Sequence, residues 1–361
     1  MSHTWGVAVR FESPESEVGQ IFAVCGTRTL SFGIAASSAT TEGLLGFAVE
    51  RVDPARDERF FMSGFKVFPS IVPHPQPGLQ VSTFEHPVQS FIWDDFTAEP
   101  DHEYTYLFHP VKGKPRNLDR SSAPLSITVR TEPLESPGRH QVFFNRGAAS
   151  SQAYQRWFGT TQIDKLDPDT RARALAWLSG DLGPAMIRFI DSCSPGDTLL
   201  GCFYEFRHLP IATAFKAAID RGVQVQVIVD TKDNSYTDKK GIIHESFPRE
   251  ANLRTITTAG IPTTNVLHRE ARPSNIAHNK YMVRLTGTPP APAEVWTGST
   301  NVSDGGISGQ TNVGHWIRDP VLAGVFAEYW TLLSNDPAAK PTTARRIRST
   351  RTPSSKPPSP P

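Results

Sequence analysis

Three consecutive segments in the middle of the chain have the pattern of a strand, a helix and a second strand. Residues 197–206, DTLLGCFYEF, form an almost continuous apolar run, as in a strand that is buried on both faces. In residues 209–222, LPIATAFKAAIDRG, apolar side chains recur at helical spacing before a glycine. Residues 223–230, VQVQVIVD, alternate between apolar and polar. Such a unit joins parallel strands, so we predict an α/β domain with a mixed sheet and a largely parallel core.

The flanking segments extend this domain over residues 149–338. Helical spacing predicts further helices at 167–179, 183–193 and 321–333. Short runs of β-branched and aromatic residues predict further strands at 253–258, 281–285 and 294–299.

Residues 1–133 have a different pattern, with short apolar or alternating runs separated by Pro, Gly and Asp clusters. About seven such runs predict an all-β sandwich domain. The core Trp93, followed by a strand with Tyr104 and Tyr106, resembles the middle of a fibronectin type III module. The predicted strands are 6–11, 19–24, 29–35, 44–52, 89–96, 104–111 and 124–131.

Two segments are predicted to lie outside the domains. Residues 134–148 are expected to be a linker, and residues 339–361 a disordered, basic tail rich in Pro and Ser. The whole chain has 37 basic and 36 acidic residues, and the tail carries basic residues only, so the rest of the chain is slightly acidic. That charge disfavours a nucleic-acid ligand for the folded part without excluding one.

Composition also bears on location. No apolar run approaches the roughly 20 residues of a membrane helix. The first residues, MSHTWGVAVRFESPESE, have neither the basic nor the apolar region of a signal peptide. Cys25, Cys193 and Cys202 are scattered and form neither a disulfide scaffold nor a zinc pattern. We therefore expect a cytoplasmic protein with no transmembrane segment and no bound metal or other cofactor.

The residues that indicate chemistry lie in SNIAHNKYMVRLTG, 274–287, and VWTGSTNVSDGG, 295–306. Alternation along a strand would direct His278 and Lys280 to one point, and likewise Ser299 and Asn301, while Gly298 would admit a ligand close to the backbone. An imidazole, an ammonium and two neutral hydrogen-bonding groups suit phosphoryl transfer. The imidazole can attack phosphorus or protonate the leaving oxygen, and the cation neutralises a phosphate oxygen.

The order of these residues resembles that of the phospholipase D superfamily over roughly residues 140–337. His278 and Lys280 match the family's H-x-K, Gly298, Ser299 and Asn301 match its G-S-x-N, and Asn312 matches the asparagine that follows. The resemblance implies catalysis by His278, Lys280, Ser299 and Asn301, with substrate contacts from Gly298 and Asn312 and a covalent phosphohistidine intermediate.

Two acids of the family pattern are missing, because Leu285 and Gly314 stand in their places. Asp304, Asp319 and Glu205 are candidate substitutes whose positions the sequence does not define. The family builds one active site from two histidine motifs, and this chain has one. The partner is therefore a second copy of the chain or a complementary second motif, and the change in composition at Ala339 favours a chain that has lost or rearranged its second half.

The sequence thus predicts a phosphoric diester hydrolase of the phospholipase D type, with a phospholipid as the preferred substrate and a role in lipid metabolism. Two alternatives stay open. One is a homodimeric, non-specific endonuclease of the same superfamily. The other is a catalytically degenerate half that binds a phosphate group or a partner, which the missing acids favour.

Overall fold

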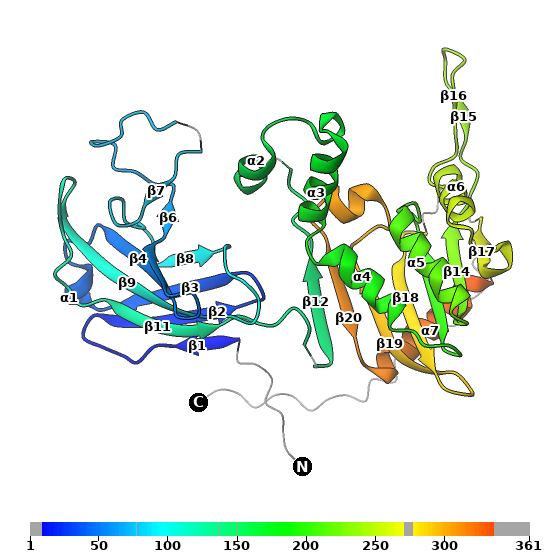
Figure 1. Ribbon diagram of the computed structural model, residues 1–361, viewed down its shortest axis with the longest axis horizontal. Helices are drawn as coiled ribbons and strands as arrows, with labels where there is room; N and C mark the ends of the chain where they lie inside the picture. The colour runs from blue at the N-terminus through cyan, green and yellow to red at the C-terminus, as the bar shows by residue number, and fades with distance from the viewer. Residues whose placement is uncertain (1–8, 77, 137, 150, 271–276, 336–361) are drawn as a thin grey trace, which may run out of the picture. The chain divides into compact units, whose positions relative to one another are not determined.

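The computed structural model describes residues 9–76, 78–136, 138–149, 151–270 and 277–335, shown in Figure 1. The chain divides into two compact units, one comprising Met1–Gln141 and Ser150–Thr160, the other Val142–Ala149 and Thr161–Pro361. The domain boundaries proposed from the sequence stay a prediction, and the predicted tail at 339–361 lies outside the described residues.

The first unit contains two main antiparallel sheets. One has the strand order β1-β2-β3-β8, with β1 at Arg10–Glu12, β2 at Gly19–Cys25, β3 at Leu30–Ala36 and β8 at Ile92–Asp95. The other has the order β10-β9-β4-β5, and β11 pairs with β9. Its strands are β4 (Gly46–Asp53), β5 (Glu58–Phe61), β9 (Glu103–Lys114), β10 (Asn117–Asp119) and β11 (Leu125–Arg130).

Both sheets contribute to one apolar core. Side chains of β2 and β3 pack with those of β4, β9 and β11, and Tyr104 and Tyr106 are fully buried there. Alternate residues of β11 are buried and exposed, as expected for a strand with one face on a core. The predicted all-β character is confirmed for the described residues up to 133, where one short helix, α1 (Ser38–Thr41), and a small β6–β7 ribbon (Ser63–Gly64 and Val81–Ser82) are added. The fibronectin resemblance stays a prediction.

The second unit is built on one seven-stranded sheet with the order β12-β20-β19-β18-β13-β14-β17. Its strands are β12 (His140–Phe144), β13 (Thr198–Phe203), β14 (Gln224–Asp230), β17 (Val266–Arg269), β18 (Lys280–Thr286), β19 (Ala291–Gly298) and β20 (Val313–Ile317). Helices cover both faces. Leu199 and Phe203 pack with α4 (Leu182–Asp191), α5 (Leu209–Asp220) and α6 (Arg249–Ala259), whereas Leu200 and Cys202 pack with α7 (Pro320–Ser334). Successive side chains of a strand point to opposite faces of the sheet, so neighbouring residues of β13 pack against helices on opposite sides.

The sheet is mixed, as predicted, but its core is not largely parallel. The pairs β13–β14 and β14–β17 are parallel, while β18 runs antiparallel to both β13 and β19, and β20 runs antiparallel to β19. For β18 and β19 the reason is that only a few residues join them, which permits a hairpin but not the long crossover that parallel strands need.

Two further expectations differ from the structure. The run at 253–258, predicted as a strand, lies inside helix α6, where Ile256 is buried and Gly260 closes the helix in the left-handed conformation. Within the predicted linker, His140–Phe144 forms β12 at the edge of the sheet.

The remaining elements are short or connect the others. They are α2 (Gln152–Phe158), α3 (Pro168–Ser179), the 3₁₀ turns Ile163–Lys165 and Thr263–Asn265, the π-helical turn Gly305–Gly309, and a two-stranded ribbon of β15 (Tyr236–Thr237) and β16 (Ile243–His244). Among the described residues, no helix combines the length and apolarity required to cross a membrane.

Candidate active site

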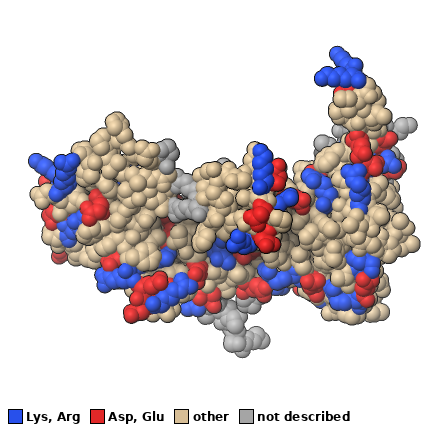
Figure 2. All heavy atoms as spheres, turned by 45° about the horizontal axis from the view of Figure 1, so that its top comes forward, with Lys and Arg blue, Asp and Glu red and all other residues tan. Residues whose placement is uncertain are grey.

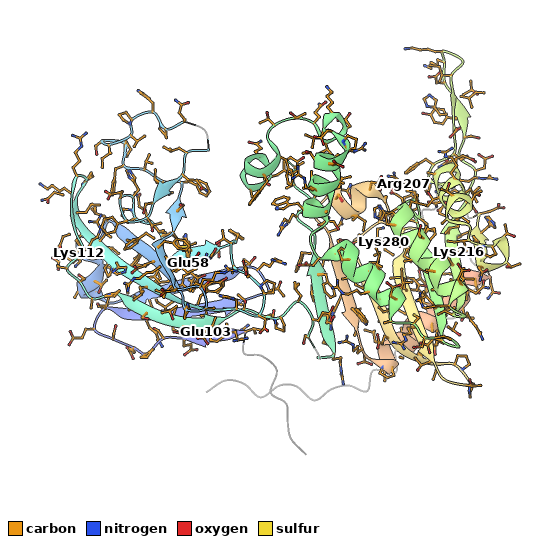
Figure 3. The ribbon with its side chains drawn as sticks, viewed as in Figure 1. Glu58, Glu103, Lys112, Arg207, Lys216 and Lys280 are labelled. Carbon is orange, nitrogen blue, oxygen red and sulfur yellow. The ribbon has the colours of Figure 1, made fainter. Side chains whose placement is uncertain are left out.

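Strand pairing brings the two predicted motifs to one edge of the sheet. Lys280 begins β18 opposite Phe203, the last residue of β13, and Tyr281 pairs with Thr297 near the end of β19. Since β18 is antiparallel to both neighbours, its start lies beside their ends. The residues before Lys280 and those after Gly298 therefore emerge at the same edge, where Figure 3 labels Lys280 and Arg207.

His278 lies just before β18 and not within it, so the expected alternation along a strand does not place its ring. Instead the ring packs edge-on against Tyr204, with 5.0 Å between the ring centroids. The next residue fixes this contact, because the carbonyl of Asn279 accepts a hydrogen bond from the Tyr204 amide at 3.0 Å.

The surroundings of His278 favour its neutral form. Partial desolvation of the ring is the main cause that lowers its pKa, and the charge of Lys280 lowers it further, while the Glu205 carboxylate acts in the opposite direction. The side chain stays exposed, so the ring is accessible. A neutral imidazole carries the lone pair that a nucleophile needs.

Lys280 is half-buried beside it, and its Nζ donates a hydrogen bond to the His278 carbonyl oxygen at 3.2 Å. Burial lowers the pKa of Lys280, and Glu205 partly offsets that effect. Glu205 is buried and accepts a hydrogen bond from Arg207 Nε at 3.1 Å. The structure therefore places a carboxylate close enough to both motif residues to act on their titration.

Ser299 and Asn312 form one hydrogen-bonded unit. Ser299 Oγ donates to Asn312 Oδ1 at 2.8 Å and accepts from the Val313 amide at 3.1 Å. Asn312 is itself anchored, because its amide donates to Asn145 Oδ1 at 2.7 Å and its Nδ2 donates to the Gly306 carbonyl at 2.8 Å. The two predicted residues are thus held together before any substrate binds.

Asn301 and Gly298 are less clearly placed for catalysis. Asn301 is half-buried, and its Oδ1 has no hydrogen-bond partner within the described part of the chain. Gly298 has φ +155°, and a Cβ there would lie 2.1 Å from the carbonyl oxygen of Val313. The neighbouring strand β20 is therefore sufficient to require this glycine, and its predicted contact with substrate stays a prediction.

The places of the two missing acids are occupied by the apolar interior. Leu285 packs partly buried against the core that includes α7. A Cβ on Gly314 would lie 2.2 Å from Cζ2 of Trp296 and 2.7 Å from Cδ1 of Leu182. The indole of Trp296, which is almost fully buried, fills the space that a side chain at 314 would need.

Of the three candidate substitutes, Glu205 is the one that raises the pKa values of His278 and Lys280. Asp319 caps helix α7 by accepting hydrogen bonds from the amides of Val321 and Leu322. Asp304 pairs with Nδ1 of His208 at 2.7 Å. The backbone amide of His208 donates to the carbonyl of Val302, so this acid–histidine pair lies next to the segment that carries Ser299 and Asn301.

Sequence reasoning missed several residues here, notably Asp230, Tyr204 and Asn145. Asp230 ends β14, is buried, and accepts a backbone hydrogen bond from Ala277, the residue before His278. Burial raises its pKa. A polar residue at the carboxyl end of a buried parallel strand is a signal that could have identified it. Asn145, in the predicted linker, carried no such signal.

The family match in comparisons with known proteins falls within this unit. Residues 186–333 match a family model described as "Cardiolipin synthase, PLD-like domain". A comparison with curated proteins found no match.

Among solved structures, the chain is similar to a phospholipase D family member, Nuc, from Salmonella typhimurium, with 23% sequence identity over 43% of this chain and 87% of that chain, and a TM-score of 0.31. It is also similar to NucT from Helicobacter pylori, with 17% identity over 55% of this chain and 96% of that chain, and a TM-score of 0.32. A third similar structure is phosphatidylserine synthase from Haemophilus influenzae Rd KW20, with 15% identity over 60% and 42% of the two chains and a TM-score of 0.33.

Proposed function

Over residues 186–333 the chain belongs to the phospholipase D superfamily, and on that premise we propose that it cleaves or transfers phosphodiesters through a phosphohistidine on His278. The observation that carries the proposal is the meeting of His278, Lys280 and Ser299 at one sheet edge, where Glu205 also acts on the first two. A phospholipid is the preferred substrate class.

In the proposed first step, the neutral imidazole of His278 forms a bond to phosphorus while the bond from phosphorus to the leaving oxygen breaks. The leaving oxygen takes a proton from a second acid. Lys280 neutralises a non-bridging oxygen. In the second step the conjugate base of that second acid takes a proton from water or an alcohol, whose oxygen bonds to phosphorus as the bond from phosphorus to the imidazole breaks. The Ser299 proton points to Asn312 in the free protein, so the hydroxyl must rotate before it can donate to phosphate.

The second acid is proposed to come from another copy of the chain, since in-line displacement needs groups on opposite sides of phosphorus. An apolar stripe on α7 supports self-association. Val321, Val325, Tyr329 and Leu332 recur at helical spacing and are exposed on the helix.

A degenerate, phosphate-binding role is the second candidate, and the observation in its favour is the apolar filling around Gly314. In that case the sheet edge with His278 binds a phosphate group but catalyses no reaction. Nuclease activity, the other alternative from the sequence, and a cytoplasmic location are likewise proposals.

The test is hydrolysis of a chromogenic phosphodiester, bis-p-nitrophenyl phosphate, alongside phosphatidylcholine and single-stranded DNA, with and without EDTA. We expect EDTA-resistant turnover that His278→Asn abolishes. The matched control is His74→Asn, which changes an exposed histidine of the first unit and should leave the rate unchanged. A rate that EDTA abolishes and magnesium or zinc restores would contradict the metal-free mechanism, and binding without turnover would support the degenerate reading.

A further inference from the structure

A slender hairpin projects from the edge of the sheet that carries the candidate site. The chain leaves the sheet at Asp230, the end of β14, forms the ribbon of β15 and β16, and returns into α6. Figure 1 shows this ribbon standing away from the rest of its unit. Arg207, which holds Glu205, also lies 5.5 Å from the ring centroid of Phe247 at the hairpin's base.

The base of the hairpin is fixed by side-chain hydrogen bonds. Asn234 donates from Nδ2 to the Phe247 carbonyl at 2.7 Å and accepts from the Phe247 amide at 2.8 Å. The Asn234 amide donates to Ser246 Oγ at 3.0 Å. These bonds join the two arms where they leave the domain, so the ribbon is a defined projection.

The projecting part exposes apolar side chains on both faces of the ribbon. Tyr236 pairs with His244, and Thr237 pairs with Ile243, so Tyr236 and Ile243 belong to opposite faces. Tyr236 is 60% exposed, Ile242 55% and Ile243 74%. Water surrounds these groups in the free protein, which is unfavourable for the two isoleucines.

Several polar groups of the turn between the strands are hydrogen-bonded within the turn. Asp238 Oδ1 accepts hydrogen bonds from the amides of Lys240 and Ile242, and Asp238 Oδ2 bonds to His244 Nε2 at 3.2 Å. The Asp238 amide donates to the Ile242 carbonyl, and the Gly241 amide to the Asp238 carbonyl. The turn can therefore enter a less polar surrounding without leaving these backbone groups unpaired.

Charge distinguishes the tip from the base. Lys239 and Lys240 are exposed at the turn, and Figure 2 shows basic side chains at the far end of the projection. The neighbouring Asp238 is hydrogen-bonded within the turn and offsets one of the two lysine charges, and Glu245 pairs with Arg254 at 3.0 Å. Two lysines beside two isoleucines are complementary to a surface of anionic headgroups over an apolar layer.

The shape favours a lipid surface over a protein partner. A flat protein surface would cover one face of a two-stranded ribbon and leave the apolar groups of the other face in water. A bilayer interface surrounds an inserted tip on all sides, and tyrosine is favoured at that depth.

We propose that the hairpin Tyr236–His244 docks the protein on an anionic membrane by inserting Ile242 and Ile243 among the headgroups while Lys239 and Lys240 contact lipid phosphates. Because the hairpin leaves the sheet at the same edge as His278, docking turns that edge toward the lipid surface. The inference rests on the proposed function for the class of substrate, but the docking itself is measurable without any turnover.

The experiment is co-sedimentation of the full chain with vesicles of phosphatidylcholine alone and of phosphatidylcholine mixed with phosphatidylglycerol. We expect binding to the mixed vesicles, weakened at least about tenfold in Ile242→Ser/Ile243→Ser, because partitioning follows the apolar area that is buried. Lys239→Glu/Lys240→Glu should weaken vesicle binding by about fivefold or more per lysine. This loss of binding should be largest at low salt. The matched control, Val24→Ser/Ile92→Ser, removes apolar side chains that are 53% and 67% exposed in the first unit and should bind as the wild type does.

Hydrolysis of bis-p-nitrophenyl phosphate, measured on the same samples, separates this inference from the proposed function. Unchanged hydrolysis in the hairpin variants together with lost vesicle binding supports the docking role. Vesicle binding without any hydrolysis supports docking while the proposed function fails. The inference is overturned if the wild-type protein binds neither kind of vesicle. It is also overturned if the hairpin variants bind vesicles as tightly as the wild type does. The inference is likewise overturned if the wild-type protein binds single-stranded DNA but not vesicles, and the hairpin substitutions remove the DNA binding.

Discussion

His278 is subject to opposing influences from its immediate neighbours. Desolvation and the charge of Lys280 lower its pKa, and Glu205 restrains that decrease. The outcome is an accessible imidazole in its neutral form, next to a cation that can hold a phosphate oxygen. The carboxylate in this structure comes from Glu205, two residues after the end of β13, whereas the family pattern places its acids at the positions of Leu285 and Gly314.

Removal of the motif side chains should separate their roles. We expect His278→Ala and Lys280→Ala each to lower kcat/KM at least about a thousandfold, since one removes the nucleophile and the other its adjacent cation. Ser299→Ala should raise the barrier by only about 1–2 kcal/mol, because it removes one hydrogen bond to the transition state. Steady-state kinetics on bis-p-nitrophenyl phosphate measures all three, with circular dichroism as the check on folding. A His278→Ala enzyme with the wild-type rate would refute the assignment.

The pH dependence of the rate should report the neutral form of His278. Because its pKa is lowered, the rate should rise with pH through a midpoint below about 6.5, the ordinary value for histidine. Glu205→Gln removes a charge that raises the pKa of His278, so the midpoint of the pH–rate profile should move to still lower pH. Glu103→Gln, in the first unit (Figure 3), is the control and should leave the midpoint where it is. An upward shift in Glu205→Gln would contradict the proposed role of this carboxylate.

At the scale of elements, the pairing of β19 with β20 explains why an acid is absent at 314. Gly298 lies opposite Gly314, and Trp296 lies opposite Trp316, so the indole of Trp296 extends over the glycine on the adjacent strand. The core below the sheet therefore depends on the absence of a side chain there.

Gly314→Ala tests this packing. We expect a loss of about 1–3 kcal/mol in the free energy of unfolding, because the new methyl group would overlap Trp296. Urea denaturation followed by tryptophan fluorescence measures it. Gly309→Ala is the control, since nothing lies within 4 Å of a Cβ at that position, and it should change stability far less. Equal stability of the two variants would show that Trp296 relaxes at little cost.

Local patterns were sufficient for some elements and insufficient for others. The apolar run at 197–206 and the alternation at 223–230 indicated β13 and β14, because burial on both faces leaves a strong pattern. The Thr and Ile run at 253–258 was misleading, since Ile256 and the cap at Gly260 stabilise a helix there. The placement of His278 outside β18, and the approach of Glu205 and Asn145, arise from pairing between distant segments, which no local pattern encodes.

At the scale of the molecule, one histidine motif per chain predicts that activity depends on self-association. Specific activity should rise with protein concentration and approach zero on dilution, because a lone chain offers one of the two required imidazoles. Assays across a wide dilution range, with sedimentation on the same samples, measure this. Val325→Asp should shift the rise to higher concentration by placing a charge on the exposed stripe of α7.

Val24→Asp is the matched control for that substitution, as both valines are 53% exposed and Val24 lies on β2. It should leave the concentration dependence unchanged. A monomer with constant, substantial specific activity would refute the need for a second copy. The pair of His208 and Asp304 would then be the first place to seek the missing acid, and loss of that activity in His208→Ala would identify it.

The position of β12 has a consequence for how the chain reaches its fold. This strand precedes all the others of its sheet in sequence, yet its neighbour in the sheet, β20, is the last strand in the described part of the chain. During synthesis β12 stays unpaired until nearly the whole unit has emerged from the ribosome. Such a long-range closure is slow relative to local pairing, so the last event in assembling the sheet also completes the Asn145–Asn312 contact beside the candidate site. Order at this site should therefore appear late in folding, after the helices and the central strands have formed.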